Sequence, residues 1–73
     1  ARASASFSTR AAGRARLSVF DVLGRCRQIA WEGELTAGPH AIAWDAGALP
    51  AGVYLVRLES GDGVASQRVV RVR

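Results

Sequence analysis

The sequence has very few of the side chains that covalent cross-links and catalytic sites require. Its 73 residues include one cysteine, one histidine and no lysine. Cys26 alone cannot form an intrachain disulfide, so the stability is expected to come from packing and strand pairing. Catalysis needs titratable groups that converge on one point. The single histidine and the six acids are scattered along the chain, so the sequence indicates no such cluster. We therefore expect no enzyme, no catalytic residue and no cofactor.

Long apolar runs are also missing. No stretch approaches the roughly 20 apolar residues of a membrane-spanning helix, and no basic-then-apolar leader resembles a signal peptide. The length suits a single domain over residues 1–73, because a core this small cannot be divided. The chain starts at Ala1 without a methionine, in strand-like sequence, so we expect it to be a piece of a longer protein.

Positive charge is concentrated in the N-terminal part. Residues 1–27 carry six arginines against one acid, whereas residues 28–73 carry four arginines against five acids. A basic half can attract nucleic acid, anionic lipid or acidic polysaccharide. No interleaved aromatic or Arg-Gly residues accompany the charge, so a nucleic-acid partner is not expected. We favour the simpler interpretation that arginine is the only base used to fill solvent-exposed faces.

Apolar residues recur with period two, and no stretch has helical periodicity. Turn signals separate these runs every eight to twelve residues, which is the pattern of a small antiparallel sandwich. The alternation predicts inward-facing stripes made of Ala15, Leu17 and Val19, of His40, Ile42 and Trp44, of Tyr54, Val56 and Leu58, and of Val70 and Val72.

The middle of the chain is harder to assign. In the segment from Arg25 to Trp31, we expect Ile29 and Trp31 to share a face, with Arg27 on the same side. Residues 32–40 are expected to form a polar connection. Six strands follow from this assignment, or seven if GELTAG supplies a short one.

Two turns have specific chemistry. Asp21 begins DVLGR, where its carboxylate can accept backbone N–H bonds and Gly24 can take the left-handed conformation of a bulged hairpin. Asp45 is expected to bond the turn that starts the crossover AGALPA, after which Gly52 passes close to a neighbour or takes a positive φ.

The two aromatic residues that flank this crossover are expected to point into one interior. Trp44 ends one inward stripe and Tyr54 begins the next, so they face that interior from opposite sides of the crossover. A tight turn is predicted at residues 60–63, followed by a last strand from Val64 to Arg73.

Four segments together resemble a known family. RLSVFDVLGR, GELTAGPHAIAWD, LPAGVYLVRLESGDG and QRVVRVR, in that order and spacing, resemble the type A C-terminal sorting domain of the type IX secretion system. They are also similar to the related immunoglobulin-like domain of flagellar-hook-capping proteins. The positions that carry the resemblance are Asp21, Gly24, Arg25, Gly38, His40, Trp44, Asp45, Gly52, Val53, Tyr54, Arg68, Arg71 and Arg73. The family usually has an apolar residue where this chain has Arg27.

The resemblance implies an all-β fold, a small immunoglobulin-like antiparallel β-sandwich of six to seven strands. It implies a non-catalytic tail that directs an upstream domain of the same chain across the outer membrane of a Gram-negative bacterium, through the periplasm to the cell surface. Its partners would be the secretion translocon or surface-attachment machinery, with no nucleic acid, no membrane span and a monomeric state.

Two other functions remain open. One is a structural spacer like the hook-capping domain. The other is a module that binds an acidic surface polymer through basic side chains near the N-terminus, namely Arg10, Arg14, Arg16, Arg25 and Arg27.

Individual reactive residues have simpler explanations. His40 and Cys26 could form a base-activated thiol, but no orienting group accompanies them, so we expect a packed histidine. One histidine and one cysteine cannot make a four-ligand metal site, so no metal is expected. Asp21 and Asp45 could imitate paired carboxylates, although turn bonding suffices to explain both. Trp31 could stack on a sugar ring, but we favour packing at the core or its rim.

The final strand alternates charge with valine. Its charges are expected on one face, where they can blunt an exposed sheet edge. The same edge could also be recognised by addition of a partner strand.

Overall fold

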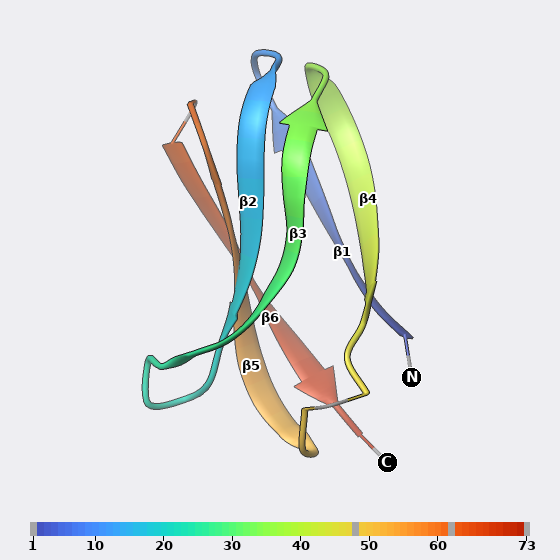
Figure 1. Ribbon diagram of the computed structural model, residues 1–73, viewed down its shortest axis with the longest axis vertical. Helices are drawn as coiled ribbons and strands as arrows, with labels where there is room; N and C mark the ends of the chain where they lie inside the picture. The colour runs from blue at the N-terminus through green and yellow to red at the C-terminus, as the bar shows by residue number, and fades with distance from the viewer. Residues whose placement is uncertain (1, 48, 62, 73) are drawn as a thin grey trace.

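Six strands in two antiparallel sheets make up the molecule (Figure 1). This computed structural model describes residues 2–47, 49–61 and 63–72, and that part of the chain contains no helix. The strands are β1 (Arg2–Thr9), β2 (Gly13–Phe20), β3 (Cys26–Leu35), β4 (Gly38–Asp45), β5 (Gly52–Ser60) and β6 (Gly63–Arg71). The predicted all-β sandwich of six to seven strands is confirmed, with six.

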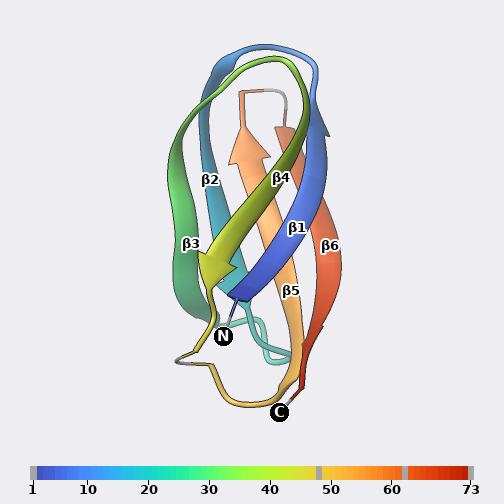
Figure 2. The same ribbon diagram turned by 90° about the vertical axis from the view of Figure 1, so that its right-hand side faces the viewer.

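The two sheets differ in size and lie face to face. β1 pairs with β4 in a two-stranded sheet, and the other four strands have the order β3-β2-β5-β6. Figure 2 shows the β1–β4 pair lying across the larger sheet, with β4 beside β3 and β1 beside β6. The interior is therefore enclosed between a four-stranded layer and a two-stranded layer.

The core is small and lies between these layers. Its fully buried side chains Leu17, Val19 and Val56 come from the two central strands of the larger sheet, and Val19 lies directly opposite Val56. The buried apolar set consists of Ala5, Phe7, Ala15, Leu17, Val19, Ile42, Trp44, Ala46, Leu49, Tyr54, Val56 and Leu58. The predicted stripes on β2, β4 and β5 are thus confirmed, with His40 only half-buried.

The outer face of the larger sheet is not uniformly polar. Arg16, Ser18 and Phe20 point to this face, as the alternation on β2 requires. Arg57 of β5 lies over the Phe20 ring, with its Cζ atom 4.5 Å from the ring centroid. This cation–π contact covers an aromatic ring that the core does not reach.

The prediction that Ile29 and Trp31 share a face is wrong. In β3, Leu17 pairs with Trp31 but the next residue, Ser18, pairs with Ile29, so Ala30 is the extra residue of a β-bulge. A bulge of one residue reverses the alternation. Trp31 consequently turns inward and packs against the core, whereas Ile29 is 50% exposed on the outer face.

A second bulge accommodates Arg27. Val19 pairs with Gln28 and Phe20 with Cys26, which leaves Arg27 without a direct partner across the ladder. Its Nη1 atom lies 3.4 Å from Asp21 Oδ2, so the side chain turns toward the hairpin instead of the core. An arginine fits here because the bulge removes the need for an apolar residue.

Residues 32–40 are not a polar connection, contrary to expectation. β3 continues to Leu35 and β4 already begins at Gly38, so only residues 36 and 37 connect them. Opposite charges lie across the β2–β3 ladder at this point, since Arg16 pairs with Glu32 and Arg14 with Glu34. Such cross-strand pairs stabilise a polar segment as strand, and no seventh strand forms in the described residues.

The inward prediction for Val70 and Val72 is also wrong. The β5–β6 hairpin pairs Ser60 with Gly63, in agreement with the tight turn, although Asp62 lies outside the described residues. This register places Val69 opposite the inward-facing Tyr54. Val70 and Val72 therefore point outward and are 56% and 72% exposed.

Both junctions between the sheets are bridged by a glutamine. The Ser6 N–H donates to Gln67 Oε1 at 3.2 Å, which joins β1 to β6. On the opposite side, Gln28 Nε2 donates to the Asp45 carbonyl at 2.9 Å, which joins β3 to β4. The chain contains no other glutamine, so each one connects strands that are not paired by a backbone ladder.

A glycine in β3 allows the Trp31 ring to lie against the backbone. A Cβ atom at Gly33 would lie 2.9 Å from Trp31 Cζ2, closer than van der Waals contact allows. We expect Gly33→Ala to push the ring away from the core and to lower the free energy of unfolding by about 1 to 3 kcal/mol. Urea unfolding followed by tryptophan fluorescence measures this change.

Gly61→Ala is the matched control, because no heavy atom lies within 4 Å of a Cβ placed there. Equal stabilities of the two variants would contradict the proposed clash at Gly33.

Candidate functional site

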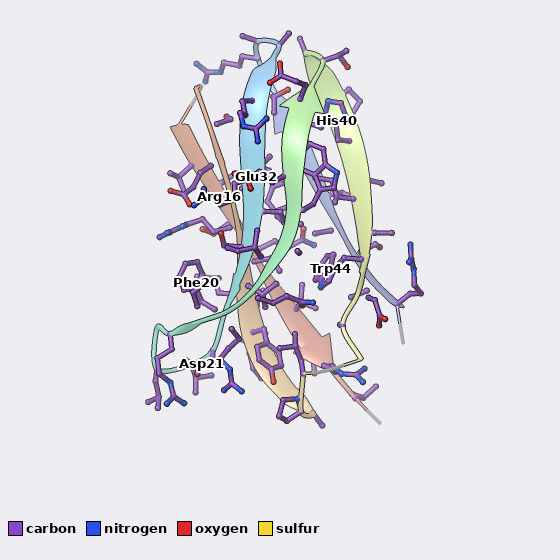
Figure 3. All side chains as sticks on the ribbon, in the orientation of Figure 1. Arg16, Phe20, Asp21, Glu32, His40 and Trp44 are labelled. Carbon is purple, nitrogen blue, oxygen red and sulfur yellow. The ribbon has the colours of Figure 1, made fainter. Side chains whose placement is uncertain are left out.

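The positions that carry the family resemblance do not converge on one point. Asp21, Gly24 and Arg25 form the β2–β3 turn, whereas Gly38 and His40 lie at the start of β4, toward the opposite end of the sandwich (Figure 3). Trp44, Asp45 and the Gly52–Tyr54 segment flank the crossover from β4 to β5. Arg68 and Arg71 belong to β6, and Arg73 lies outside the described residues.

The β2–β3 turn is organised by one carboxylate. Asp21 Oδ1 accepts the backbone N–H groups of Leu23 at 2.9 Å and Arg25 at 3.0 Å. Asp21 Oδ2 accepts the Arg25 Nε–H at 3.0 Å, and Gly24 has a φ of 81°. The predicted bonding by Asp21 and the left-handed conformation of Gly24 are both confirmed. Glycine suits this position, since a residue with a Cβ atom is strained at this φ.

Hydrogen bonds also determine the acidity of this carboxyl. The Arg25 backbone N–H, assisted by its guanidinium and by the Leu23 N–H, holds the pKa of Asp21 below its usual value of 3.8. The charged form is therefore favoured in the folded chain more than in the unfolded chain. Its contribution to stability is fully present above about pH 3.8 and is lost as the pH falls through the lower folded-state pKa.

We expect Asp21→Asn to make the thermal unfolding midpoint less dependent on pH. The amide oxygen can still accept both backbone N–H bonds, but the charge that titrates is gone. Circular dichroism melts between about pH 2 and pH 5 measure this difference. Glu34→Gln, which removes an exposed charge from β3, is the control, and an equal flattening in both variants would contradict the assignment to Asp21.

His40 and Cys26 are not brought together. His40 lies opposite Phe7 in the smaller sheet, whereas Cys26 lies opposite Phe20 in the larger sheet, next to the β2–β3 turn. The His40 Nε2 atom is 2.6 Å from the Thr36 carbonyl oxygen, which can only accept, so this nitrogen carries the proton. His40 consequently supports the short β3–β4 connection and has no thiol to activate.

The other candidate chemistry is likewise divided among separate places. Asp21 and Asp45 belong to different turns, and each accepts bonds from its own turn. Within the residues that the structure describes, no three histidine, cysteine or acidic side chains are close enough to hold a metal ion. Trp31 packs against the core, which accounts for its position without a sugar ligand.

The β4–β5 crossover is held at several points. Asp45 Oδ1 accepts the Gly47 N–H at 2.9 Å, which lowers the pKa of this carboxyl from its usual value. The Leu49 N–H donates to the Ala46 carbonyl at 3.0 Å, and Arg71 Nε donates to the Leu49 carbonyl at 2.7 Å. The expected bonding of the turn by Asp45 is confirmed.

Trp44 and Tyr54 face one interior, as predicted. They are 5% and 6% exposed, and both line the same cavity beside the crossover. The Tyr54 hydroxyl donates to the Pro50 carbonyl at 2.6 Å. Gly52, which starts β5, has a positive φ of 157°, and Val53 points outward opposite Val70.

Tyr54→Phe tests the bond between β5 and the crossover. The ring stays in the core, but the Pro50 carbonyl loses its donor. We expect the free energy of unfolding to fall by about 1 kcal/mol, as measured by chemical denaturation. A variant as stable as the wild type would show that the hydroxyl contributes no net stability.

The charges of the last strand do not lie on one face, contrary to the prediction. Arg68 lies opposite Leu55 on the outer face, whereas Arg71 lies on the face that carries Val69 and bonds the crossover. These arginines are three positions apart, and an odd spacing puts side chains on opposite faces of a strand. β6 nevertheless remains an edge strand of its sheet.

Four of the five arginines considered for polymer binding, all except Arg10, form two local groups. Arg14 and Arg16 lie 3.9 and 3.1 Å from Glu32, near the middle of the molecule. Arg25 and Arg27 lie 3.0 and 3.4 Å from Asp21, in the hairpin turn (Figure 3). Both groups contain an acid that partly neutralises them, so these four arginines do not form one continuous basic surface.

These observations define the class of protein. The positions that distinguish the sequence shape turns and fill the core of a β-sandwich, which is typical of a structural or recognition module. No helix in the described residues has the length and apolar character to cross a membrane.

The comparison with known families specifies this class. Residues 4–72 match the family described as the secretion system C-terminal sorting domain. The chain belongs to this family, whose members are sorting domains of type IX secretion and not enzymes. No curated protein and no solved structure matched the chain.

Proposed function

We propose that this chain is a non-catalytic module that directs an upstream cargo domain through the type IX system to the cell surface. The observation that carries the proposal is the family match over residues 4–72, which includes all six strands apart from the first two residues of β1. Family membership indicates a sorting signal for type IX secretion. The cargo domain, the translocon or attachment machinery as partner, and passage through a Gram-negative periplasm are parts of the proposal.

Recognition would rest on the folded surface and the last strand. β6 is an edge strand, so one side of its backbone has no paired strand in its own sheet. Its outer face presents Arg68, with Val70 and Val72 exposed beside the C-terminal end. An edge with backbone groups and alternating side chains suits strand addition by a partner. The module would act as a single domain and a monomer.

The proposal requires that export depend on the fold. The test joins the 73-residue chain to the C-terminus of a periplasmic reporter in a host with an active type IX system. We expect the reporter at the cell surface or in the medium, measured by fractionation and immunoblotting. A reporter that stays in the periplasm would remove the sorting function and favour the structural spacer.

Two matched substitutions separate folding from surface contact. Val56→Asp buries a charge at a position that is fully enclosed, so it should abolish export. Val22→Asp makes the same change in the β2–β3 turn, away from β6, at a position that is 78% exposed, and export should persist. If both variants were exported equally, an unfolded linear signal would replace the folded module.

A further inference from the structure

The tip of the β2–β3 turn carries two large apolar side chains. The Gly24 N–H donates to the Asp21 carbonyl, so Val22 and Leu23 are the central residues of the turn, and they are 78% and 74% exposed. Turn centres are usually occupied by glycine, proline, asparagine, aspartate or serine. In Figure 1 the turn extends sideways, away from the smaller sheet. Neither the core nor the geometry of the turn therefore accounts for these two side chains.

Two arginines flank this apolar tip. Arg25 and Arg27 lie 3.0 and 3.4 Å from Asp21 Oδ2, yet the Asp21 side chain is only 10% exposed, against 65% for Arg25 and 38% for Arg27. The carboxylate is directed into the turn, where it accepts the N–H groups of Leu23 and Arg25. The surface around the tip is therefore cationic, because two guanidinium groups cover the one acid between them.

The outer face of the larger sheet continues this surface. Phe20, the last residue of β2, lies opposite Leu55, and Leu55 lies opposite Arg68. Val53 is on the same face of β5 as Leu55, and it lines one groove together with Val22. Apolar and cationic side chains thus extend from the turn onto the neighbouring strands.

The acids of the larger sheet lie toward its other end. Apart from Asp21, the acids that the described residues place on this sheet are Glu32, Glu34 and Glu59. All three lie opposite arginines in the first half of β2, whereas the turn follows the last residue of that strand. The turn end of the sheet therefore has an excess of positive charge.

From this surface we propose that the β2–β3 turn docks on an anionic lipid bilayer. Val22 and Leu23 enter the boundary between headgroups and acyl chains, and Arg25 and Arg27 contact the lipid phosphates. Charge complementarity identifies this partner, because anionic headgroups present negative charge on every side of an inserted tip. Docking is separate from the sorting function, so a turn variant that loses it is still exported.

The probe is a large unilamellar vesicle of phosphatidylglycerol and phosphatidylcholine in equal parts. It is mixed with the 73-residue chain and collected by centrifugation. We expect the chain to sediment with these vesicles and to stay in solution with vesicles of phosphatidylcholine alone, which have no net charge. Sedimentation should decrease as salt is added, because salt screens the attraction between arginines and headgroups.

Two matched comparisons locate the contact. The double substitution Val22→Ser and Leu23→Ser should weaken binding about tenfold, since the apolar surface that enters the bilayer is lost. Val64→Ser, at an exposed position beside the opposite turn of β5 and β6, should leave it unchanged. Arg27→Gln should weaken binding about fivefold. Arg14→Gln removes a 67% exposed arginine at the other end of β2 and should have a much smaller effect.

These variants are expected to fold. The bonds that Asp21 Oδ1 accepts come from the backbone of Leu23 and Arg25, and none of the replaced side chains takes part in them. Circular dichroism spectra and melting midpoints check this for each variant.

A polarity-sensitive dye distinguishes insertion from adsorption. It is attached to Leu23→Cys or, as the control, to Ala11→Cys in the connection at the opposite end of β2. Both carry Cys26→Ser, which removes the exposed native thiol. With anionic vesicles, the dye emission should shift to shorter wavelength at position 23 and stay constant at position 11.

Three results would overturn the proposal. The first is a folded chain that stays in solution with anionic vesicles at low salt. The second is an equal loss of binding in Arg27→Gln and Arg14→Gln, which would reduce binding to overall charge. The third, without vesicles, is a molecular mass that rises with protein concentration and returns to that of a monomer in the double serine variant, which would assign the turn to a second copy of the chain.

Discussion

The packing of β2 against β5 supports the rest of the molecule. Leu17 and Val19 lie opposite Leu58 and Val56, and these side chains form the centre of the core. β3 adds to the outer side of β2 and β6 to the outer side of β5. With no disulfide and with 14 alanines among its 73 residues, the chain has few large apolar side chains to bury. The register of this one strand pair therefore determines which residues of β2 and β5 face the interior.

The second layer completes the core through a few large side chains. Ile42 and Trp44 of β4, with Phe7 of β1, cover the inward face of the larger sheet. No backbone ladder joins the two sheets, so glutamine side chains bridge the junctions at both sides. The second layer covers only the inner face of the larger sheet, and β6 stays an edge strand of that sheet.

Most of the family positions can be understood as structural. Asp21 and Asp45 accept backbone N–H bonds in two turns, His40 supports a third connection, and Tyr54 joins β5 to the crossover. The bonding by the two aspartates was predicted from the sequence, because turn chemistry acts over a few residues, whereas the hydrogen bonds of His40 and Tyr54 were not. Arg71 was not predictable in the same way, since its partner, the Leu49 carbonyl, lies 22 residues away. The cavity beside the crossover is lined by residues from five strands and from the crossover itself, so no local pattern indicated it.

By itself, the sequence determined the β class, the turns and the inward stripes of β2, β4 and β5, because period-two alternation and turn bonding are local properties of the chain. Only the tertiary structure decided the orientation of Ile29, Val70 and Val72. A bulge at Ala30 and the closure of the β5–β6 hairpin at Ser60 and Gly63 each set a register, and a shift of one residue moves every following side chain to the other face. That choice depends on which strands lie next to each other, which alternation within one strand does not specify.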